Sequence, residues 1–466
     1  MLARLLHSLG PLVVLLSATT GACTDPAGQD TQADTGTDSA SDTGADSDPT
    51  EGTGGVGACG AELPAVALLG KPGEAAGDAV AGAGDVNGDG LPDVVVGAPG
   101  NIEPDFPGVP GRAYVLFSPL ASESIDLVGS DGLVLVGEEP RHAVGTVVEG
   151  VGDVNGDGFA DVLVGATRRC YFNEECDLEG ESGDCYDPCS VTPYRAYLVH
   201  GRADAGEILL KDVAAGKGGF SISGEDDWSG DTQAYAPMGD LNKDGLADFA
   251  VATLEFGSGK VYVVFGRKDT TPVALEQLEA TGGGYKIQAE SSSDQLGGRA
   301  MRAAGDVNGD GLMDLILGAS YFESSGRGYV VFGKASTTTV KLSALAAGKG
   351  GGFALLGEGG MTGLAVAPAG DMNHDGFADV AISAPYLDVD GDFGAGRVYV
   401  VFGKADPAPV ELGAFTAGAR ITGDGLLGYV LNGDGSDLNG DGEPDLIVGD
   451  GSNTLTLVSG AAAGAD

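Results

Sequence analysis

The chain has 466 residues, of which 24 are Lys or Arg and 69 are Asp or Glu, so its formal net charge is −45. A surface this acidic excludes non-specific nucleic-acid binding and tight adsorption to anionic lipid, because both need basic residues. Glycine accounts for 83 residues, yet 42% of the chain is hydrophobic and there is no strict Gly-X-Y period, which excludes collagen and wholesale disorder.

Residues 1–22 are typical of a secretion signal. Arg4 supplies a positive charge, and residues 9–18 form an apolar stretch that is too short to span a membrane. A pair of small residues precedes Cys23, and this arrangement resembles a bacterial lipoprotein signal, in which the cysteine is lipidated; Thr20 stands where such signals usually carry Leu. We expect an exported lipoprotein of the outer membrane or cell surface, whose only membrane contact is the lipid on Cys23. Ordinary cleavage, giving a periplasmic or secreted protein, is the alternative.

Residues 23–58 are predicted to be a disordered acidic tether. Residues 24–58 are rich in Asp, Thr, Ser and Gly, and they contain no Lys or Arg and almost nothing to bury. A flexible segment of this length has an r.m.s. span of roughly 30–35 Å. The tether would therefore hold the remaining chain, residues 59–466, away from an anchor at Cys23.

One nine-residue motif, Asp-x-Asn-x-Asp-Gly-x-x-Asp, organises residues 59–466. It occurs six times, and the copies begin at Asp85, Asp153, Asp240, Asp306, Asp371 and Asp437. The intervals are 68, 87, 66, 65 and 66 residues, so the second unit carries an insertion, at about residues 168–193. Internal repeats of this length are typical of propellers and other repeat architectures.

Each unit is predicted to supply about four short strands and no convincing amphipathic helix. After each motif comes an apolar run, then a strand such as KVYVVFG (260–266), and then a shorter strand ending at glycine. Four-stranded sheets repeated around an axis form an all-β propeller, in which few strand edges are exposed. Six blades is the economical number and seven is the alternative. A lone strand at 64–70 precedes the first motif, and we expect it to complete the last blade and close the ring.

The motif presents oxygen ligands of the kind that hard cations prefer. Three Asp and one Asn side chains, with a backbone carbonyl at position 7, provide a coordination number close to that of calcium. An EF-hand is excluded, because position 12 holds Val, Leu or Ile within the following apolar strand instead of Glu. Magnesium is the alternative cation, and a simple Asx-Gly turn is the alternative without a metal.

The loop, the small-residue turn after the next strand and the VYVVFG strand together resemble the FG-GAP repeats of the integrin alpha-subunit propeller. The resemblance covers about residues 60–466, and only remnants of the Phe-Gly element survive, such as Leu296-Gly297. It implies a β-propeller that binds about six calcium ions, one in the hairpin loop between the first and second strand of each blade.

The resemblance also implies which residues are the calcium ligands. The side-chain ligands are Asp85, Asn87, Asp89 and Asp93; Asp153, Asn155, Asp157 and Asp161; Asp240, Asn242, Asp244 and Asp248; Asp306, Asn308, Asp310 and Asp314; Asp371, Asn373, Asp375 and Asp379; and Asp437, Asn439, Asp441 and Asp445. The backbone carbonyls are those of Leu91, Phe159, Leu246, Leu312, Phe377 and Glu443. His374, at a variable position of the fifth loop, has no implied role.

Four cysteines lie in the insertion of the second unit. In an exported protein, Cys170, Cys176, Cys185 and Cys189 predict two disulfides, with the pairing left open. A four-cysteine zinc site is the alternative. Cys59 has no obvious partner. The insertion is either a recognition element or a tolerated loop.

No catalytic constellation is visible in the sequence, so an enzyme is not expected. We expect a calcium-binding module at the cell surface that acts in binding or adhesion, with an unidentified extracellular protein or carbohydrate as its partner. A structural envelope protein is the first alternative and a hydrolase that uses the propeller channel is the second. A channel carboxylate with a shifted pKa would favour the enzyme, and an exposed apolar or aromatic patch would favour binding.

Overall fold

The computed structural model describes residues 13–16, 65–100, 110–120, 124–138, 142–168, 195–224, 231–255, 258–291, 294–298, 300–416, 418–423, 425–451 and 454–460. The tether, Cys23, Cys59, the insertion and its four cysteines lie outside these ranges, as does most of the expected signal segment. The predicted lipid anchor and disulfides are therefore not addressed by the structure.

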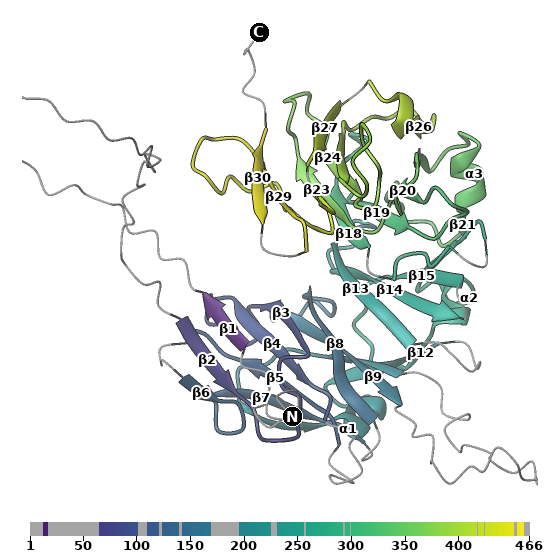
Figure 1. Ribbon diagram of the computed structural model, residues 1–466. Coiled ribbons are helices and arrows are strands. Elements are labelled where there is room, and N and C mark those ends of the chain that lie inside the picture. Colours follow the sequence, from purple (N-terminus) through teal and green to yellow (C-terminus); the bar gives the residue numbers. More distant parts are fainter. Residues whose placement is uncertain are drawn as a thin grey trace, which may run out of the picture.

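The regular secondary structure of the described chain is mostly β-strand, and six of its sheets are built around the six motifs (Figure 1). The first sheet contains β3 (Ala79–Gly84), β4 (Asp93–Ala98), β5 (Arg112–Leu116), β7 (Gly132–Val136) and β11 (Gly206–Leu209). The second contains β8 (His142–Gly152), β9 (Asp161–Arg168), β10 (Arg195–Val199), β12 (Gly219–Ser223) and β16 (Val273–Ala274). The third contains β13 (Asp231–Gly239), β14 (Asp248–Glu255), β15 (Ser258–Val264), β17 (Gly284–Gln288) and β21 (Val340–Lys341).

The remaining sheets follow the same order. The fourth contains β18 (Met301–Gly305), β19 (Asp314–Ala319), β20 (Arg327–Val331), β22 (Gly352–Leu356) and β26 (Val410–Glu411). The fifth contains β23 (Val366–Gly370), β24 (Asp379–Ala384), β25 (Arg397–Val401) and β27 (Gly418–Thr422). The last contains β28 (Val430–Asn432), β29 (Asp445–Gly449) and β30 (Leu455–Ser459), and a separate small sheet contains β1 (Val13–Leu16), β2 (Ala65–Leu69) and β6 (Ser124–Asp126).

The first five motif sheets each have four antiparallel strands, as expected for propeller blades. A short strand contributed by the following blade pairs in parallel with the outermost strand of four of these sheets, as β11 does with β7. Strands such as β19 are buried along their whole length, because a neighbouring blade covers each face of the sheet. The sequence DLILGA therefore lacks the alternation expected of a strand with one solvated face.

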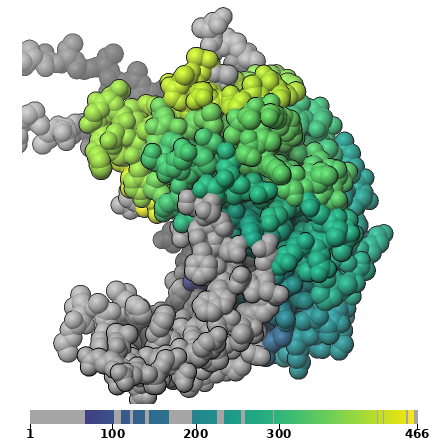
Figure 2. All heavy atoms as spheres, turned by 90° about the vertical axis from the view of Figure 1, so that its right-hand side faces the viewer, coloured from purple at the N-terminus to yellow at the C-terminus, as the bar shows by residue number. Residues whose placement is uncertain are grey.

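The blades are arranged around an arc whose inner wall is formed by the first strand of each sheet (Figure 1). The strands β3, β8, β13, β18, β23 and β28 contact one another in that order. Five apolar clusters each join two successive blades, and a sixth joins β2 to the first blade. In the space-filling view, the teal and green blades form one continuous body (Figure 2). The fold is that of a β-propeller.

Short helices are the element that the sequence prediction missed. They are α1 (Leu210–Ala214), η2 (Leu275–Gln277), α2 (Leu278–Thr281), α3 (Leu342–Ala346) and η3 (Leu412–Ala414). Each follows one of the short parallel strands, except α2, which continues from η2, and each places a buried leucine against its blade, as Leu342 does. The recurring strings LKDVAAGKGGF and LSALAAGKGGGF, starting at residues 210 and 342, carry this signal. No helix within the described ranges has the length and apolar character needed to cross a membrane.

The N-terminal strand β2 does not pair with the last sheet in this structure. It pairs with β1 in antiparallel orientation and with β6 in parallel orientation. The last sheet has only three described strands, and β30 is at its edge. Ring closure by residues 64–70 therefore remains a prediction.

Candidate functional site

Each of the six motif loops connects the first strand of a blade to the second. The first runs from Asp85 to Asp93, between β3 and β4, and the others occupy the equivalent hairpin. The glycine at position 6 has a positive φ in every loop, between 81° and 93°, which explains why no other residue type occurs there. All six loops therefore lie at the same end of their sheets.

The aspartate at position 1 is the centre of each loop. In the first loop, Oδ1 of Asp85 accepts hydrogen bonds from the N–H groups of Gly88 (2.7 Å) and Asp89 (3.0 Å), and Oδ2 accepts one from Gly90 (2.9 Å). The sixth loop repeats all three bonds around Asp437. The loop thus folds around a carboxylate whose negative charge is partly compensated by the dipoles of backbone N–H groups.

Positions 3 and 5 add a second layer of side-chain oxygens. Oδ1 of Asn87 accepts from the N–H of Asp89 (2.9 Å), the same group that bonds to Asp85, so these two oxygens lie side by side. Asp89 in turn accepts from the N–H of Leu91 (2.8 Å). Three acidic or amide side chains of one loop are thereby gathered over a single turn.

The aspartate at position 9 is buried and links its loop to the third strand of its own blade. Asp314 accepts from the N–H of Val307 (2.8 Å) within the loop and from the N–H of Gly333 (2.7 Å), just beyond β20. Burial raises the pKa of Asp314 to about 7, although these two hydrogen bonds oppose the shift. Burial likewise raises the pKa of Asp161 to about 7 and those of Asp248 and Asp379 to about 6.

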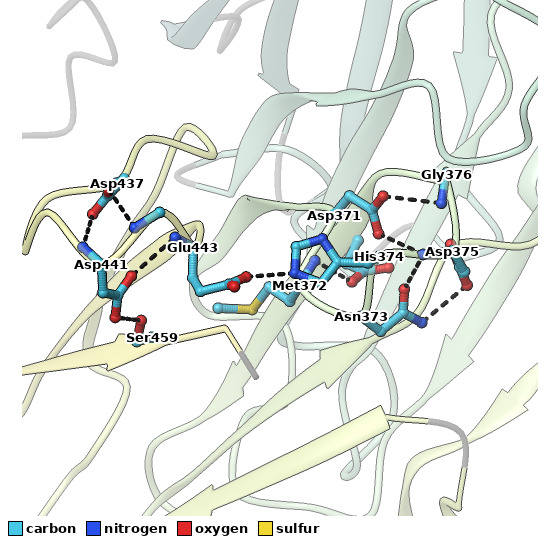
Figure 3. Close-up of polar contacts among 12 residues, drawn as sticks. Asp371, Met372, Asn373, His374, Asp375, Gly376, Asp437, Asp441, Glu443 and Ser459 are labelled. Atoms are coloured by element: carbon cyan, nitrogen blue, oxygen red, sulfur yellow. Dashed lines mark hydrogen bonds and ion pairs between the residues drawn. The ribbon is translucent and has the colours of Figure 1, made fainter. Parts of the chain in front are cut away.

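Neighbouring loops also contact one another. The N–H of Ala160 in the second loop donates to the carbonyl of Asp85 in the first (2.9 Å), and the second–third and fourth–fifth pairs repeat this bond. The sixth loop has Pro444 at the donor position, so it has no N–H to give. There, Nε2 of His374 in the fifth loop lies 2.5 Å from Oε2 of Glu443 in the sixth (Figure 3). His374, which had no role in the sequence interpretation, bridges the last two loops.

The loops have the donor chemistry for a hard cation, but in this structure their oxygens are engaged with backbone N–H groups. Asp, Asn and carbonyl oxygens are the ligands that calcium prefers. Within the described residues, no group of three His, Cys, Asp or Glu side chains is arranged to hold a metal ion. Positions 1, 3 and 5 converge, whereas the position-9 carboxylate is directed into the blade. The residue types therefore fit calcium, and the observed geometry is that of a hydrogen-bonded turn.

A repeated contact between blades, which the sequence interpretation missed, lies in the triads of Glu, Arg and Tyr. Glu290, which follows the outermost strand of the third blade, accepts from Arg327 (2.7 Å) and from the hydroxyl of Tyr329 (2.6 Å) on the third strand of the fourth blade. Three further triads have the same arrangement: Glu74 with Arg112 and Tyr114, Glu138 with Arg195 and Tyr197, and Glu358 with Arg397 and Tyr399. The recurring Arg-x-Tyr strands were the available signal.

One carboxylate on the inner wall also has a shifted pKa. Burial raises the pKa of Glu149 on β8 to about 7, and the charge of Arg302 on β18 opposes the shift. Glu149 and Arg302 occupy equivalent positions of β8 and β18. Each pairs across the sheet with the residue two positions after the position-9 Asp of its own blade. Three other inner strands carry alanine there: Ala81, Ala236 and Ala367.

The FG-GAP repeat family matches this chain at residues 76–116, 147–171, 303–331 and 362–401. These matches fall on the first, second, fourth and fifth blades. The third blade has the same motif and sheet order although it lies outside the matched residues.

Curated proteins similar to this chain are integrin alpha subunits. The chain is 34% identical over 160 residues to integrin alpha-7 of Mus musculus, which covers 33% of this chain and 12% of that protein. It is 35% identical over 179 residues to integrin alpha-IIb of Mus musculus (35% of this chain, 16% of that protein). It is 30% identical over 230 residues to integrin alpha-V of Gallus gallus (46% and 19%). Each alignment covers less than a fifth of the relative. The chain contains FG-GAP repeats in four places and is similar over part of its length to integrin alpha subunits.

Proposed function

We propose that this protein is an exported, calcium-loaded β-propeller that acts as a binding module at the cell surface. The observation that carries the proposal is the set of six equivalent loops, gathered at one end of the blades and sharing one set of oxygen donors. Similarity to integrin alpha subunits supports an adhesion-type role with an extracellular partner. The expected lipid on Cys23 and the expected tether would hold the propeller away from the membrane.

Calcium would bind to lone pairs of the loop oxygens that the backbone N–H groups leave free. Its ligands would be the side chains at positions 1, 3, 5 and 9 and the carbonyl at position 7 of each loop. Binding requires the position-9 carboxylate to be ionised, and its burial makes that state costly without a cation. The ion would therefore supply the positive charge that each acidic loop lacks.

Ring closure by β2 is a further part of the proposal, and the neighbours of β2 support it. In the fourth blade, the outermost strand β22 has an antiparallel partner (β20) on one side and a short parallel strand (β26) on the other. β2 has the same two kinds of neighbour, β1 and β6. Glu74, which follows β2, also forms a triad with the first blade, as the glutamates after other outermost strands do with the next blade. These neighbours support β2 as the fourth strand of the last sheet, which has three strands among the described residues.

The partner that β2 has in this structure belongs to the expected signal segment. β1 occupies the edge of β2 on which the third strand lies in a complete blade. Cleavage before Cys23 would remove β1 and leave that edge free for β30. Apolar side chains are exposed on both flanks that would meet, including Leu69 and Val80 on one and Leu455 on the other.

A hydrolase that uses the propeller channel is the second candidate, and Glu149 is the observation that favours it. A half-buried carboxylate with a pKa of about 7 is suited to proton transfer near neutral pH. Glycoside hydrolysis generally needs a second carboxylate. Replacement of Glu149 by Gln, with turnover of chromogenic glycosides and esters as the measurement, separates this candidate from a pure binding module.

Thermal unfolding of the full chain with excess calcium and after chelation tests the proposal. Extracellular calcium modules commonly have Kd values of about 10⁻⁴–10⁻³ M. With free calcium at about ten times Kd, each occupied site adds about 1.4 kcal/mol, so six sites add about 8 kcal/mol. We expect a large decrease in Tm on chelation, and about six bound calcium ions per chain before it. An unchanged Tm with no bound calcium would mean that the loops are only turns.

A further inference from the structure

Three exposed tyrosines surround one pocket at the end of the blades opposite the motif loops. Tyr321 follows β19, Tyr386 follows β24, and Tyr429 precedes β28. In an antiparallel blade, the connection after the second strand and the entry to the first strand lie at the end away from the first hairpin. The pocket spans the fourth, fifth and last blades and has a volume of about 510 Å³, within the range of pockets that hold small ligands.

The rings of these tyrosines are available to a ligand. The exposed fractions of Tyr321, Tyr386 and Tyr429 are 50%, 44% and 41%. The described residues offer their hydroxyl groups no hydrogen-bond partner, in contrast to the buried tyrosines of the triads. A ring with one free face and a free hydroxyl can make apolar contact and donate a hydrogen bond to the same ligand.

The backbone that carries the three tyrosines is held in place before any ligand arrives. Tyr321 is next to Phe322, which is buried beneath the guanidinium of Arg327 at 3.9 Å from the ring centroid. Tyr386 is held by its N–H, which donates to the carbonyl of Gly360 (3.1 Å). The ring of Tyr429 lies against Gly451 so closely that an added Cβ there would be 2.6 Å from it. Preorganisation of this kind reduces the entropy lost on binding.

The described lining of the pocket is uncharged, although the chain has a net charge of −45. Besides the tyrosines it consists of Gln295, Ser320, Met361 and small or aliphatic residues. A pocket near the third motif loop differs in this respect, because Asp244, Arg267 and Asp269 contribute to its wall. A charged ligand would find no opposite charge among the described lining residues. A neutral ligand with hydroxyl groups and apolar faces matches rings, hydroxyls and amides.

We propose that this tyrosine pocket binds a neutral sugar ring, as part of a glycan on another surface. The proposal rests on the binding function proposed above and assigns it a site and a ligand class. The tyrosine rings would lie against the C–H faces of the sugar, and the tyrosine hydroxyls with Gln295 and Ser320 would bond to its hydroxyl groups. Equivalent positions in the first two blades lack the ring: Gly100 corresponds to Tyr321, and Thr146 corresponds to Tyr429.

Saturation-transfer NMR on the calcium-loaded full chain tests the pocket. The probes are the methyl glycosides of glucose, galactose, mannose and N-acetylglucosamine, with galacturonic acid and glucosamine as charged probes. We expect at least one neutral glycoside to bind. Tyr321→Ala, Tyr386→Ala and Tyr429→Ala should each weaken it at least tenfold, and the corresponding Phe variants only several-fold. Phe393→Ala, which removes a ring that is 93% exposed and outside the pocket lining, should leave binding unchanged.

Two results would overturn the sugar site. One is that no neutral glycoside binds, or that only a charged probe does, while calcium still stabilises the fold. The other is binding that the three tyrosine substitutions leave intact. Capture of an extracellular protein by the wild-type chain without glycoside binding would preserve the proposed function and reject this pocket as a sugar site. Loss of the calcium effect and of all binding would reject both.

Discussion

The fourth blade and the last sheet carry the same motif, but they differ in what surrounds it. In the fourth blade, Asp314 accepts an N–H beyond β20, and a triad joins the blade to the third one. In the last sheet, Oδ1 of Asp445 accepts, among the described residues, only from the side chain of Asn439, at 3.3 Å. The third strand β30 has Leu455 and Leu457 exposed, with Thr456 where Tyr329 stands in β20.

The difference shows that the motif alone determines the loop, whereas burial of the strands also needs neighbouring strands and blades on both sides. β19 is buried throughout because β18 to β22 are covered on both faces. Within the described part of the chain, β30 has a neighbour on one edge only, and its leucine at position 455 is 72% exposed. The last sheet therefore has the sequence pattern of a blade, but the apolar side chains of its edge strand are exposed.

Removal of residues 65–69 should have the largest effect on the difference in protection between the last sheet and the fourth blade. If β2 completes the last sheet once the signal segment is cleaved, its loss exposes the edge of β30 and the apolar flank beside it. We expect the amide hydrogens of β30 to exchange at least a hundredfold faster in the deletion variant, while those of β19 stay protected. Deletion of five residues from the tether, such as 30–34, is the control. Equal protection of β30 in both variants would contradict closure by β2.

A smaller effect is expected for the stability of two matched variants, Asp314→Ala in the fourth blade and Asp445→Ala in the last sheet. The first leaves two buried N–H groups without an acceptor, and each such group costs about 1–3 kcal/mol. The second leaves two N–H groups, of Leu438 and Asn439, in a more exposed loop. We expect the free energy of unfolding to fall by roughly 3–5 kcal/mol in Asp314→Ala and by less than half of that in Asp445→Ala, measured by urea unfolding without calcium. Equal losses would show that the link to the third strand contributes nothing.

The pH dependence of the calcium-free protein should reflect the buried position-9 carboxyls. Their folded-state pKa values, about 6 to 7 for Asp161, Asp248, Asp314 and Asp379, lie above the usual ~3.9 of the unfolded chain. The folded state therefore binds more protons, and the stability this provides is present at low pH and lost as pH rises through 6 to 7. We expect urea midpoints to fall between pH 5 and pH 8 in metal-free buffer.

Calcium should cancel this pH dependence, because it binds the ionised carboxylates. The matched measurement is the same pair of urea midpoints in excess calcium, where the midpoint at pH 8 should equal or exceed that at pH 5. A calcium-free midpoint that rises with pH would rule out the buried carboxyls as the cause.

The smallest effect is expected for Tyr329→Phe in a triad. Loss of the hydroxyl removes one hydrogen bond to Glu290, which keeps its bond to Arg327, so the cost should be about 1 kcal/mol. Tyr386→Phe, whose hydroxyl has no described partner, should leave the urea midpoint unchanged. A double-mutant cycle with Glu290→Gln measures the coupling, and independent effects would show that the triad does not join the blades.

The repeated blade could be predicted from the sequence because the motif fixes a hairpin at a constant position. Asp85 and its five equivalents mark the loop, and the apolar run that follows each motif marks the second strand. The short helices were missed because α3 has only five residues and depends on contacts of Leu342 with its blade. Such a segment has no helical periodicity to detect, since it completes little more than one turn.

The candidate site was only partly predictable for a different reason. Ligand types follow from the motif, but the direction of a side chain depends on the rest of the blade. Asp314 is directed to an N–H that is 19 residues away, and His374 meets Glu443 of the next unit. The tyrosine pocket depends on three units at once, so no single repeat contains its pattern.

The triads have a consequence for how such a chain can change in length. The first and fourth blades each carry the Arg and Tyr on the third strand and a Glu after the fourth strand, so each presents one half of the contact to the element before it and the other half to the next blade. A blade of this kind, if duplicated in the gene, would thus meet matching partners on both sides, and so would its neighbours. Joints built on the triad are therefore interchangeable, and the array of blades could gain or lose such a blade by recombination without redesign of the surfaces that meet.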